Sequence, residues 1–290
     1  MKIVICGISG FVGNALKEHF TARGDDVLSL SVRSNISVES IAKKLEGCDV
    51  LLNLAGANIL GRWTSNYKNV LRQSRLETTD KLTKALKYAT NPPKVLLNAS
   101  AVGIYDNLHQ HDEDSHHFEN DFLSTLVQDW ESAAMQASSS SVRVCLLRFG
   151  VVYGKGGGAM AKMLPPFKLG LGGNMGSGNQ IISWIHLNDL VNMFAFLIDH
   201  PQLEGVFNAT SPHPLSNADQ TKAMGTILHR PVFLDMPSWL VKLIFGEGSS
   251  VILDSKEVYP TRLLEAGFRF NYPTFESAFR QIITHNGDTQ

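Results

Sequence analysis

The chain has 290 residues, of which 43% are hydrophobic, and a formal net charge of −1 at pH 7. A near-neutral charge argues against a general nucleic-acid binder, and no stretch reaches the roughly 18 uncharged apolar residues that a membrane span needs. The chain starts directly with a strand-like segment, so we expect no signal peptide and a cytoplasmic protein. The length predicts one large domain or two unequal ones.

The glycine-rich turn near the N-terminus is the most informative motif. It lies between a strand-like segment, residues 2–6, and a helix-like segment, residues 11–23. Glycines let the backbone turn sharply and approach a pyrophosphate, and the first helical turn directs free N–H groups at it. The alternative is a glycine-rich turn that binds no ligand. We expect cofactor contacts from Gly7, Ser9, Gly10, Phe11, Val12 and Gly13.

Short apolar strands alternate with helices through the first half of the chain. Strands are expected at residues 2–6, 27–32, 50–54, 95–99 and 142–149, and helices at 11–23, 38–45, 67–89 and 121–137. This alternation predicts an α/β fold, a Rossmann-type doubly wound parallel sheet with a smaller C-terminal α/β lobe. We expect an NADP-binding domain over residues 1–155, with strands returning from 180–210, and the substrate lobe over 156–290.

The segment after the second strand indicates which dinucleotide binds. It contains Ser31, Arg33 and Ser34, and it has no acidic residue between Asp26 and Glu39. A site selective for NAD usually places a carboxylate here, whereas a cation with hydroxyl groups suits a 2′-phosphate. We therefore predict NADP (NADPH) as the cofactor. The alternative is that Arg33 is an ordinary solvated surface charge.

Two further segments are candidates for cofactor contacts. Leu54, Ala55 and Gly56 follow the third strand, where small residues let the backbone lie against the ribose and phosphates, although a tight turn would use the same glycine. Arg75 lies on the next helix and either reaches the cofactor or substrate or is a solvated surface charge.

Several motifs resemble one family of known proteins. Residues 100–105 and 148–154 resemble the extended short-chain dehydrogenases/reductases, and residues 156–160, 165–173, 183–186 and 263–273 resemble its atypical "epimerase family" subgroup. That subgroup carries an extra C-terminal domain of unassigned function. The resemblance implies a Rossmann fold with bound NADP, adds Ser100 and Val152 to the expected cofactor contacts, and implies no known substrate.

The chain departs from that family at its catalytic pair. Productive members use Tyr-x-x-x-Lys after the fourth strand, where the tyrosine transfers a proton and the lysine lowers the pKa of the tyrosine. If Glu131 is aligned with the acidic residue that commonly follows this pair, the two positions fall on Leu123 and Val127, and neither side chain exchanges a proton. No Tyr-x-x-x-Lys occurs between Ser100 and Arg148. The usual serine or threonine falls on Ala101, with Ser100 one residue early.

Three residues are candidates to replace the missing pair. Ser100 offers a hydroxyl, Tyr105 lies in the loop after the fourth strand, and His186 has a side-chain pKa in the useful range. Tyr105 has the alternative role of packing at the cofactor edge. His186 has the alternative role of fixing the helix that follows it.

The polar segment 106–120 contains His109, His111, His116 and His117 among carboxylates. The spacing of these residues fits no regular metal site, so we expect no metal ion and predict a mobile loop that acts as a lid over the substrate cleft. The glycine-rich segment 154–178 either forms part of a substrate pocket or is a flexible connection with a short amphipathic helix.

The remaining C-terminal elements are expected as follows. A strand over 206–210 precedes a helix over 217–229 that Ser216 caps, and a further helix over 262–267 ends at a glycine. The apolar segment 237–245 is expected to pack on the sheet or line the cleft. The three cysteines, Cys6, Cys48 and Cys145, match no metal motif and are expected to be reduced and buried or partly buried.

Two functions from different classes fit these observations. The first is an NADP-dependent oxidoreductase or epimerase that acts on a small polar substrate of the sugar-nucleotide kind. The second is an NADP-binding module without turnover, used for redox sensing or protein contact. Both predict a small-molecule ligand, no nucleic-acid or membrane partner, and a monomer or homodimer.

Overall fold

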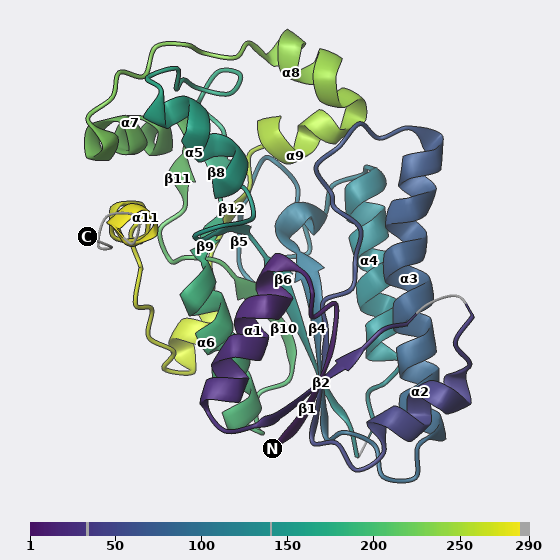
Figure 1. Ribbon diagram of the computed structural model, residues 1–290. Coiled ribbons are helices and arrows are strands. Elements are labelled where there is room, and N and C mark those ends of the chain that lie inside the picture. The colour runs from purple at the N-terminus through teal and green to yellow at the C-terminus, as the bar shows by residue number, and fades with distance from the viewer. Residues whose placement is uncertain (33–34, 140, 285–290) are drawn as a thin grey trace.

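A computed structural model describes residues 1–32, 35–139 and 141–284. Its centre is a six-stranded sheet with the order β10-β6-β4-β3-β1-β2, and every neighbouring pair in it is parallel (Figure 1). The strands are β1 (Lys2–Cys6), β2 (Asp26–Leu30), β3 (Val50–Asn53), β4 (Val95–Ala101), β6 (Arg143–Phe149) and β10 (Gly205–Ala209). Because β10 pairs with β6, a late segment of the chain completes the sheet that the N-terminal half begins.

Helices cover both faces of this sheet. α1 (Phe11–Ala22) and α6 (Leu187–Asp199) bury Leu16, Phe20 and Phe194 in the core of one face. On the other face, α2 (Val38–Leu45), α3 (Ser65–Tyr88) and α4 (Phe122–Met135) form a second core (Figure 1). Strands with both faces buried are expected to be continuously apolar. The predicted Rossmann-type α/β fold is confirmed.

Capping side chains determine where two helices begin, and the first residues predicted from the sequence differ from the observed ones by one or two positions. α3 begins at Ser65 rather than residue 67, because the Thr64 hydroxyl accepts a hydrogen bond from the Tyr67 backbone N–H at 3.2 Å. α4 begins at Phe122, because the Asp121 carboxylate accepts one from Ser124 N at 2.7 Å. Such caps satisfy N–H groups that a helix leaves unpaired at its N-terminus.

Short strand pairs connect the sheet to the C-terminal part of the chain. β5 (Gln110–His111) pairs with β12 (Glu257–Val258), β7 (Val151–Tyr153) with β9 (Trp184–His186), and β8 (Ile181–Ile182) with β11 (Leu215–Ser216). The helical elements around them are the 3₁₀ turns η1 (Val102–Ile104) and η2 (Gly246–Ser249), with α5 (Met160–Lys168), α7 (Asn217–Leu228), α8 (Ser238–Phe245), α9 (Ser250–Leu253), α10 (Thr261–Glu265) and α11 (Phe275–Thr284). Ser216 caps α7 as predicted.

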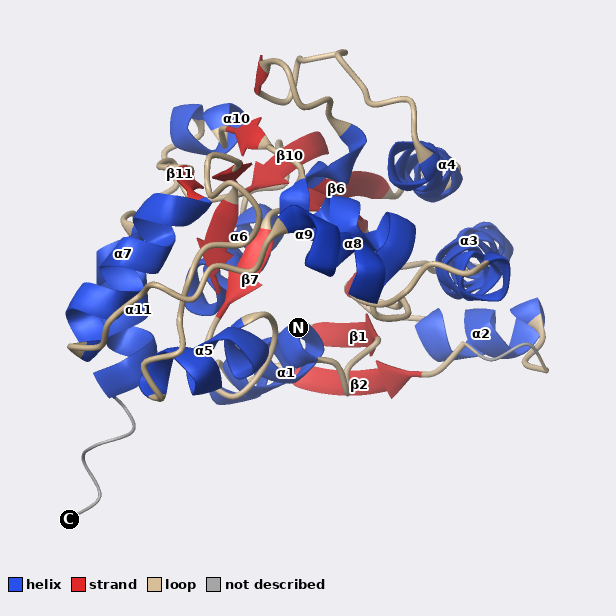
Figure 2. Ribbon diagram, turned by 90° about the horizontal axis from the view of Figure 1, so that it is seen from above, coloured by secondary structure: helices blue, strands red, loops and turns tan. Residues whose placement is uncertain are grey.

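The apolar helix α8 corrects one expectation. It buries Val241 alone, while Trp239, Leu243 and Ile244 are exposed, so it does not pack on the sheet. Arg62, in the loop after β3, donates a hydrogen bond from Nη1 to the Leu243 carbonyl at 3.2 Å. Figure 2 shows α8 and α9 side by side when the molecule is seen from above. Packing on the sheet is therefore wrong for this segment, and the alternative, that it lines the cleft, stays a prediction.

The polar segment 106–120 also differs from the expected mobile loop. β5 within it pairs with β12, and Tyr105 forms a β-bridge with Phe118 at its base. His111 and Glu113 are buried, and Glu113 accepts hydrogen bonds from Asn208 N at 2.9 Å and Arg262 N at 3.2 Å. The segment is therefore tied to the rest of the protein along most of its length.

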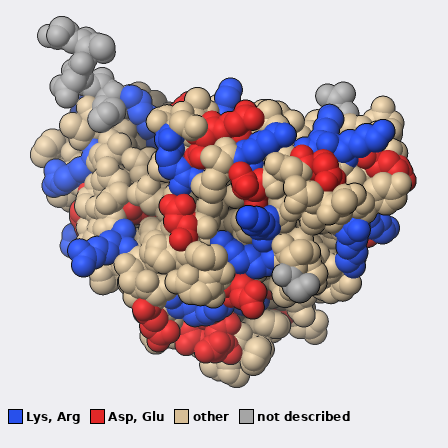
Figure 3. Space-filling model, turned by 90° about the horizontal axis from the view of Figure 1, so that it is seen from below, with Lys and Arg blue, Asp and Glu red and all other residues tan. Residues whose placement is uncertain are grey.

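The surface and the thiols agree with the composition. Basic and acidic side chains alternate over the face in Figure 3. All three cysteines are free and buried, as predicted. Across the described ranges, none of the helices combines the length and apolar character that a bilayer span requires.

Candidate cofactor and substrate site

The glycine turn between β1 and α1 is closed by its own backbone. Gly7 has φ +87°, a conformation that favours glycine, and Gly10 N donates to the Gly7 carbonyl at 3.0 Å. A Cβ on Gly13 would lie 2.3 Å from that same carbonyl oxygen, so no larger residue fits there. Gly10 caps α1 without a side-chain hydrogen bond. Because glycine has no side chain, the N-cap residue offers no acceptor to the backbone N–H groups of the first helical turn.

A cavity of about 530 Å³ opens at this helix N-terminus. Ser9 and Gly10 line it from the turn, Asn14 from α1, and Lys155 and Gly157 from the loop after β7. The Phe11 ring packs on that loop, because a Cβ on Gly157 would lie 2.2 Å from it. Val12 packs against the core of the sheet. Phe11 thus lines the cavity while it packs on that loop, whereas the Val12 side chain points to the core.

Arg75 lies beside the segment Leu54-Ala55-Gly56 that follows β3. A Cβ on Gly56 would lie 3.1 Å from the Arg75 Cζ. The guanidinium donates to the Ala57 carbonyl at 3.1 Å and the Leu71 carbonyl at 3.3 Å, and it lies 5.3 Å from the centre of the Trp130 ring. Burial lowers the pKa of Arg75 to about 10. Within the described residues, no carboxylate forms an ion pair with this cation.

Four further residues expected to contact the cofactor are Ser31, Arg33, Ser34 and Val152, and the structure describes only two of them. Ser31 is exposed just beyond the end of β2, and Val152 in β7 packs partly against the core of the sheet. Arg33 and Ser34 lie outside the described residues. The structure therefore leaves the choice between NADP and NAD to the sequence argument.

Ser100 and Tyr105 are brought together through a buried ion pair. The Ser100 hydroxyl donates to Glu131 Oε1 at 2.5 Å. Arg148 donates to both oxygens of Glu131, and its Nη1 donates to the Tyr105 hydroxyl at 2.7 Å. We call these residues with Asn208 the β4–β6 network. The network joins the strands β4, β6 and β10 to the helix α4 and to Tyr105, which follows η1.

Tyr105 is held on every side within this network. Its hydroxyl lies 2.9 Å from Asn208 Oδ1 and 2.9 Å from the Asp112 carbonyl oxygen. Burial raises the pKa of Tyr105, although Arg148 opposes that shift. Sequence reasoning did not single out Glu131 and Arg148 as site residues. The available signal was Arg148, an arginine that follows the apolar residues of β6, since a buried arginine implies a buried partner.

His186 caps α6 and shares no hydrogen bond with the β4–β6 network in the part of the chain that is described. Its Nδ1 accepts from Asn188 N at 3.2 Å, its Nε2 lies 3.0 Å from Gln281 Oε1, and its ring lies 4.1 Å from that of Tyr272. Burial lowers the pKa of His186 to about 4, so the imidazole is neutral at pH 7. These contacts agree with a structural role.

Apolar packing occupies the positions where the proton-transfer pair would lie. Leu123 fills the space over Gly103, where an added Cβ would come within 2.5 Å of its Cδ2 atom. Val127 packs in a cluster with Ile104, Tyr105 and Val258. The helix face that would present a tyrosine and a lysine is therefore apolar.

The glycine turn, the parallel sheet and the doubly wound topology define a dinucleotide-binding α/β protein. Residues 3–209 match the model of the NAD dependent epimerase/dehydratase family, and residues 236–282 match a domain of unknown function (DUF1731). The chain belongs to the NAD dependent epimerase/dehydratase family, and the resemblance to its atypical epimerase-family members is confirmed.

Similar proteins cover the whole chain. The human epimerase family protein SDR39U1 is 37% identical over 98% of this chain and 100% of its own length, and a chloroplastic homolog from Arabidopsis thaliana is 35% identical over 98% and 87%. The crystal structure of the human protein (isoform 2) with NADPH superposes with a TM-score of 0.92, at 37% identity over 98% of this chain and 99% of that one. A nucleoside-diphosphate sugar epimerase from Corynebacterium glutamicum reaches 0.79 at 28% identity, covering 98% of this chain and 58% of that one.

Proposed function

We propose that the chain binds NADPH at the N-terminal glycine turn. The fit of Gly7 and Gly13 to a tight backbone turn, with no side chain capping α1, is the observation that carries this proposal. The human relative, whose crystal structure contains NADPH, supports it. Backbone amides at the start of α1 would hold the pyrophosphate. When bound, NADPH supplies a hydride.

Arg75 supplies a second argument for a bound anion. A half-buried guanidinium without a carboxylate partner is electrostatically incomplete, because burial removes water that would otherwise stabilise the charge. Among the described residues, its hydrogen-bond acceptors are the backbone carbonyls of Leu71 and Ala57, and it lies beside Gly56. We assign Arg75 to a phosphate of the dinucleotide or of the substrate. Ser31, Arg33 and Ser34 are assigned to the adenosine ribose and its 2′-phosphate, and Val152 and Ser100 to the far end of the cofactor.

The first function we propose is an NADPH-dependent oxidoreductase or epimerase acting on a small polar substrate. The likeness to the Corynebacterium glutamicum sugar epimerase makes sugar nucleotides the first class to test. Ser100, Tyr105 and His186 remain the candidates for proton transfer. Among them, Tyr105 is the one whose hydroxyl contacts a cation, Arg148, which would stabilise a phenolate, while burial of the side chain raises the pKa of Tyr105 and opposes that role.

A second candidate function is an NADPH-binding module without turnover. It is favoured by the apolar packing of Leu123 and Val127 at the catalytic positions. It is also favoured by the internal hydrogen bonds that occupy Ser100 and His186. A positioned acid or base contributes about 10²–10⁴ to a rate, so its absence would leave binding largely intact while slowing chemistry.

A fluorescence titration with NADPH tests the binding proposal. We expect Arg75→Leu to weaken binding by about tenfold or more, because a charge-assisted hydrogen bond is lost. Arg72→Leu is the matched control, since Arg72 lies one turn earlier on α3 and pairs with Asp129 at 2.8 Å. Absence of NADPH binding to the wild type would overturn the proposal. Equal losses in both variants would remove Arg75 from the site.

Turnover separates the two functions. A panel of simple carbonyl compounds would be screened with NADPH, and a panel of sugar nucleotides with NADP⁺, by absorbance at 340 nm. Product analysis of the NADP⁺ reactions would detect epimerisation, in which the oxidised cofactor accepts a hydride and returns it, so that no net cofactor is consumed. Substrate-dependent change that Tyr105→Phe abolishes would support the enzyme. No change across the panel, with NADPH binding intact, would favour the module.

We also propose a small-molecule partner, a cytoplasmic location, and a monomer or homodimer built from a cofactor domain (1–155, with strands from 180–210) and a substrate lobe (156–290). The segment 154–178, with α5 inside it, is assigned to the substrate pocket. Light scattering after gel filtration tests the subunit number. Cell fractionation tests the location.

A further inference from the structure

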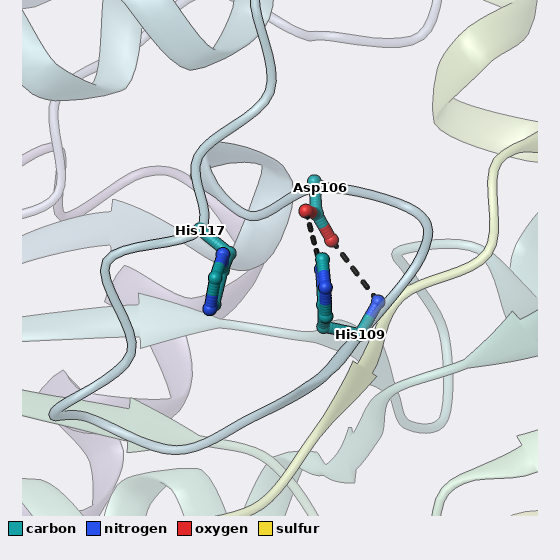
Figure 4. Close-up of side chains that lie close together, drawn as sticks. All are labelled: Asp106, His109 and His117. Atoms are coloured by element: carbon teal, nitrogen blue, oxygen red, sulfur yellow. Dashed lines mark hydrogen bonds and ion pairs between the residues drawn. The ribbon is translucent and has the colours of Figure 1, made fainter.

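The loop between η1 and α4 brings Asp106, His109 and His117 together (Figure 4). One carboxylate oxygen and one ring nitrogen from each histidine lie within 4.8 Å of one another. The spacing of these residues along the chain matches no metal motif. They meet because the fold of the loop places His117 beside Asp106 and His109. We call the three residues the Asp–His–His cluster.

The backbone of the loop fixes the two sides of this cluster. Asp106 N donates to the His117 carbonyl at 3.0 Å, and the neighbouring Tyr105 and Phe118 form a β-bridge. Asp106 and His117 are therefore direct neighbours across the base of the loop. Their side chains meet without any movement of the main chain.

The Asp106 carboxylate is oriented by four groups. Its Oδ1 accepts from Leu108 N at 3.0 Å and His109 N at 3.1 Å, and its Oδ2 lies 2.7 Å from His109 Nδ1. Burial opposes ionisation, but these hydrogen bonds lower the pKa of Asp106 to about 2. Beneath it, Nε2 of the buried His111 lies 3.2 Å from the carboxylate, and the other nitrogen of that ring lies 2.8 Å from the Ser115 hydroxyl. His111 is a positioning residue for a permanently ionised carboxylate.

The two histidines face each other across the cluster. Figure 4 shows their rings side by side. The rings are stacked, with centroids 4.1 Å apart and an interplanar angle of 18°. Both side chains are exposed, so a dissolved ion reaches both rings, and binding would replace the contact between His109 Nδ1 and Asp106 Oδ2 where that nitrogen is the ligand. Two imidazole nitrogens and one carboxylate oxygen form a donor set that suits zinc and its neighbours, whereas calcium and magnesium prefer oxygen ligands alone.

We propose that Asp106, His109 and His117 bind one divalent transition-metal ion and that this ion joins the two sides of the loop. Three protein ligands leave a position for water. The ion would fix the loop whose base, Tyr105, contacts Arg148 of the β4–β6 network. This proposal is independent of NADPH binding, because none of its residues lies among the proposed cofactor contacts.

Zinc alone is the probe for the test. Protein without an affinity tag would be stripped with a chelator, and Zn²⁺ binding would be measured by equilibrium dialysis with elemental analysis. We expect one high-affinity Zn²⁺ per chain. His117→Ala and Asp106→Asn should each weaken that site by at least about tenfold, a loss that even the removal of groups supporting a ligand can produce. Asn at position 106 still accepts the hydrogen bonds from Leu108 and His109, so the turn is retained.

His116→Ala is the matched control, because His116 is an exposed histidine of the same loop outside the cluster. It should bind Zn²⁺ as the wild type does. Replacing Zn²⁺ with Co²⁺ should give visible absorption bands of a low-coordinate site in the wild type and in His116→Ala, but not in His117→Ala. Less than one Zn²⁺ per chain at about 100 μM free metal would overturn the proposal. This concentration should saturate the site, because preformed metal sites in proteins bind zinc with micromolar or tighter affinity. Equal losses in His116→Ala and His117→Ala would overturn it too.

Discussion

Glu131 of α4 and Arg148 of β6 form a two-point ion pair, with Arg148 Nε 2.8 Å from Oε1 and Nη2 2.7 Å from Oε2 of the carboxylate. The two side chains are 10% and 5% exposed, so the pair is almost fully removed from water. Ser100 donates a third hydrogen bond to the same carboxylate. Removing one partner from such a pair leaves a buried charge, which costs more than the net value of the pair itself.

Glu131→Gln should therefore be strongly destabilising. The amide keeps the size of the side chain but leaves the Arg148 cation unneutralised, and we expect a loss of about 3–5 kcal/mol in the free energy of unfolding. Urea denaturation followed by circular dichroism measures it. The control is the double variant Glu131→Leu with Arg148→Met, which removes both charges and should recover most of that loss. A loss below about 1 kcal/mol in Glu131→Gln, the range of an exposed pair, would show that water reaches the pair.

The glycine turn gives a second prediction, which concerns Gly13. The Cβ of Gly13→Ala would lie 2.3 Å from the Gly7 carbonyl oxygen and 2.8 Å from the Ile8 Cα, and both are backbone atoms that cannot move independently. We expect NADPH affinity to fall by about 100-fold or more, because moving the turn misplaces every amide that would meet the pyrophosphate. Fluorescence titration measures the effect.

Gly24→Ala is the control for this variant. Gly24 follows α1 with φ +89° and open space around the position of a Cβ, so the substitution costs only left-handed backbone strain of about 1–2 kcal/mol. Its NADPH affinity should equal that of the wild type. If the two variants bound NADPH equally well, the turn would not be the cofactor site.

The sequence alone predicted the sheet and its helices because burial on two faces leaves a local signal. Apolar strand segments such as residues 50–52 and capped helices such as α7 have this signal within a few residues. The β4–β6 network has only one local signal, the arginine in the apolar strand β6, and its partners could not be predicted because Ser100, Glu131 and Arg148 meet only after three separate elements pack. The sequence did not predict the Asp–His–His cluster for the same reason, because its three residues meet only once the loop has folded. α8 misled the prediction because hydrophobicity does not reveal whether a partner covers it.

The third prediction concerns cofactor choice and rests on the sequence, since Arg33 lies outside the described residues. Arg33→Asp should weaken NADPH far more than NADH, because it removes a cation from the 2′-phosphate and adds a negative charge beside it. Parallel titrations with the two cofactors measure the ratio. Equal losses for both would show that Arg33 does not contact the 2′-phosphate.

His186 gives the last prediction, a pH dependence of stability. Burial lowers the pKa of this imidazole in the folded protein to about 4, below its ordinary value of 6.5. Between pH 6.5 and pH 4, His186 is therefore protonated in the unfolded chain but neutral in the folded protein. The contribution of neutral His186 to the free energy of unfolding is fully present above pH 6.5 and is lost as the pH drops toward 4. The slope contributed by one such group is about 1.4 kcal/mol per pH unit. His186→Asn caps α6 without titrating, so its stability should fall less steeply over this window, while Asp189 titrates in both proteins. Urea denaturation at pH 4.5, 5.5 and 7.5 measures the difference, and parallel curves for the two proteins would show that His186 titrates normally in the folded state.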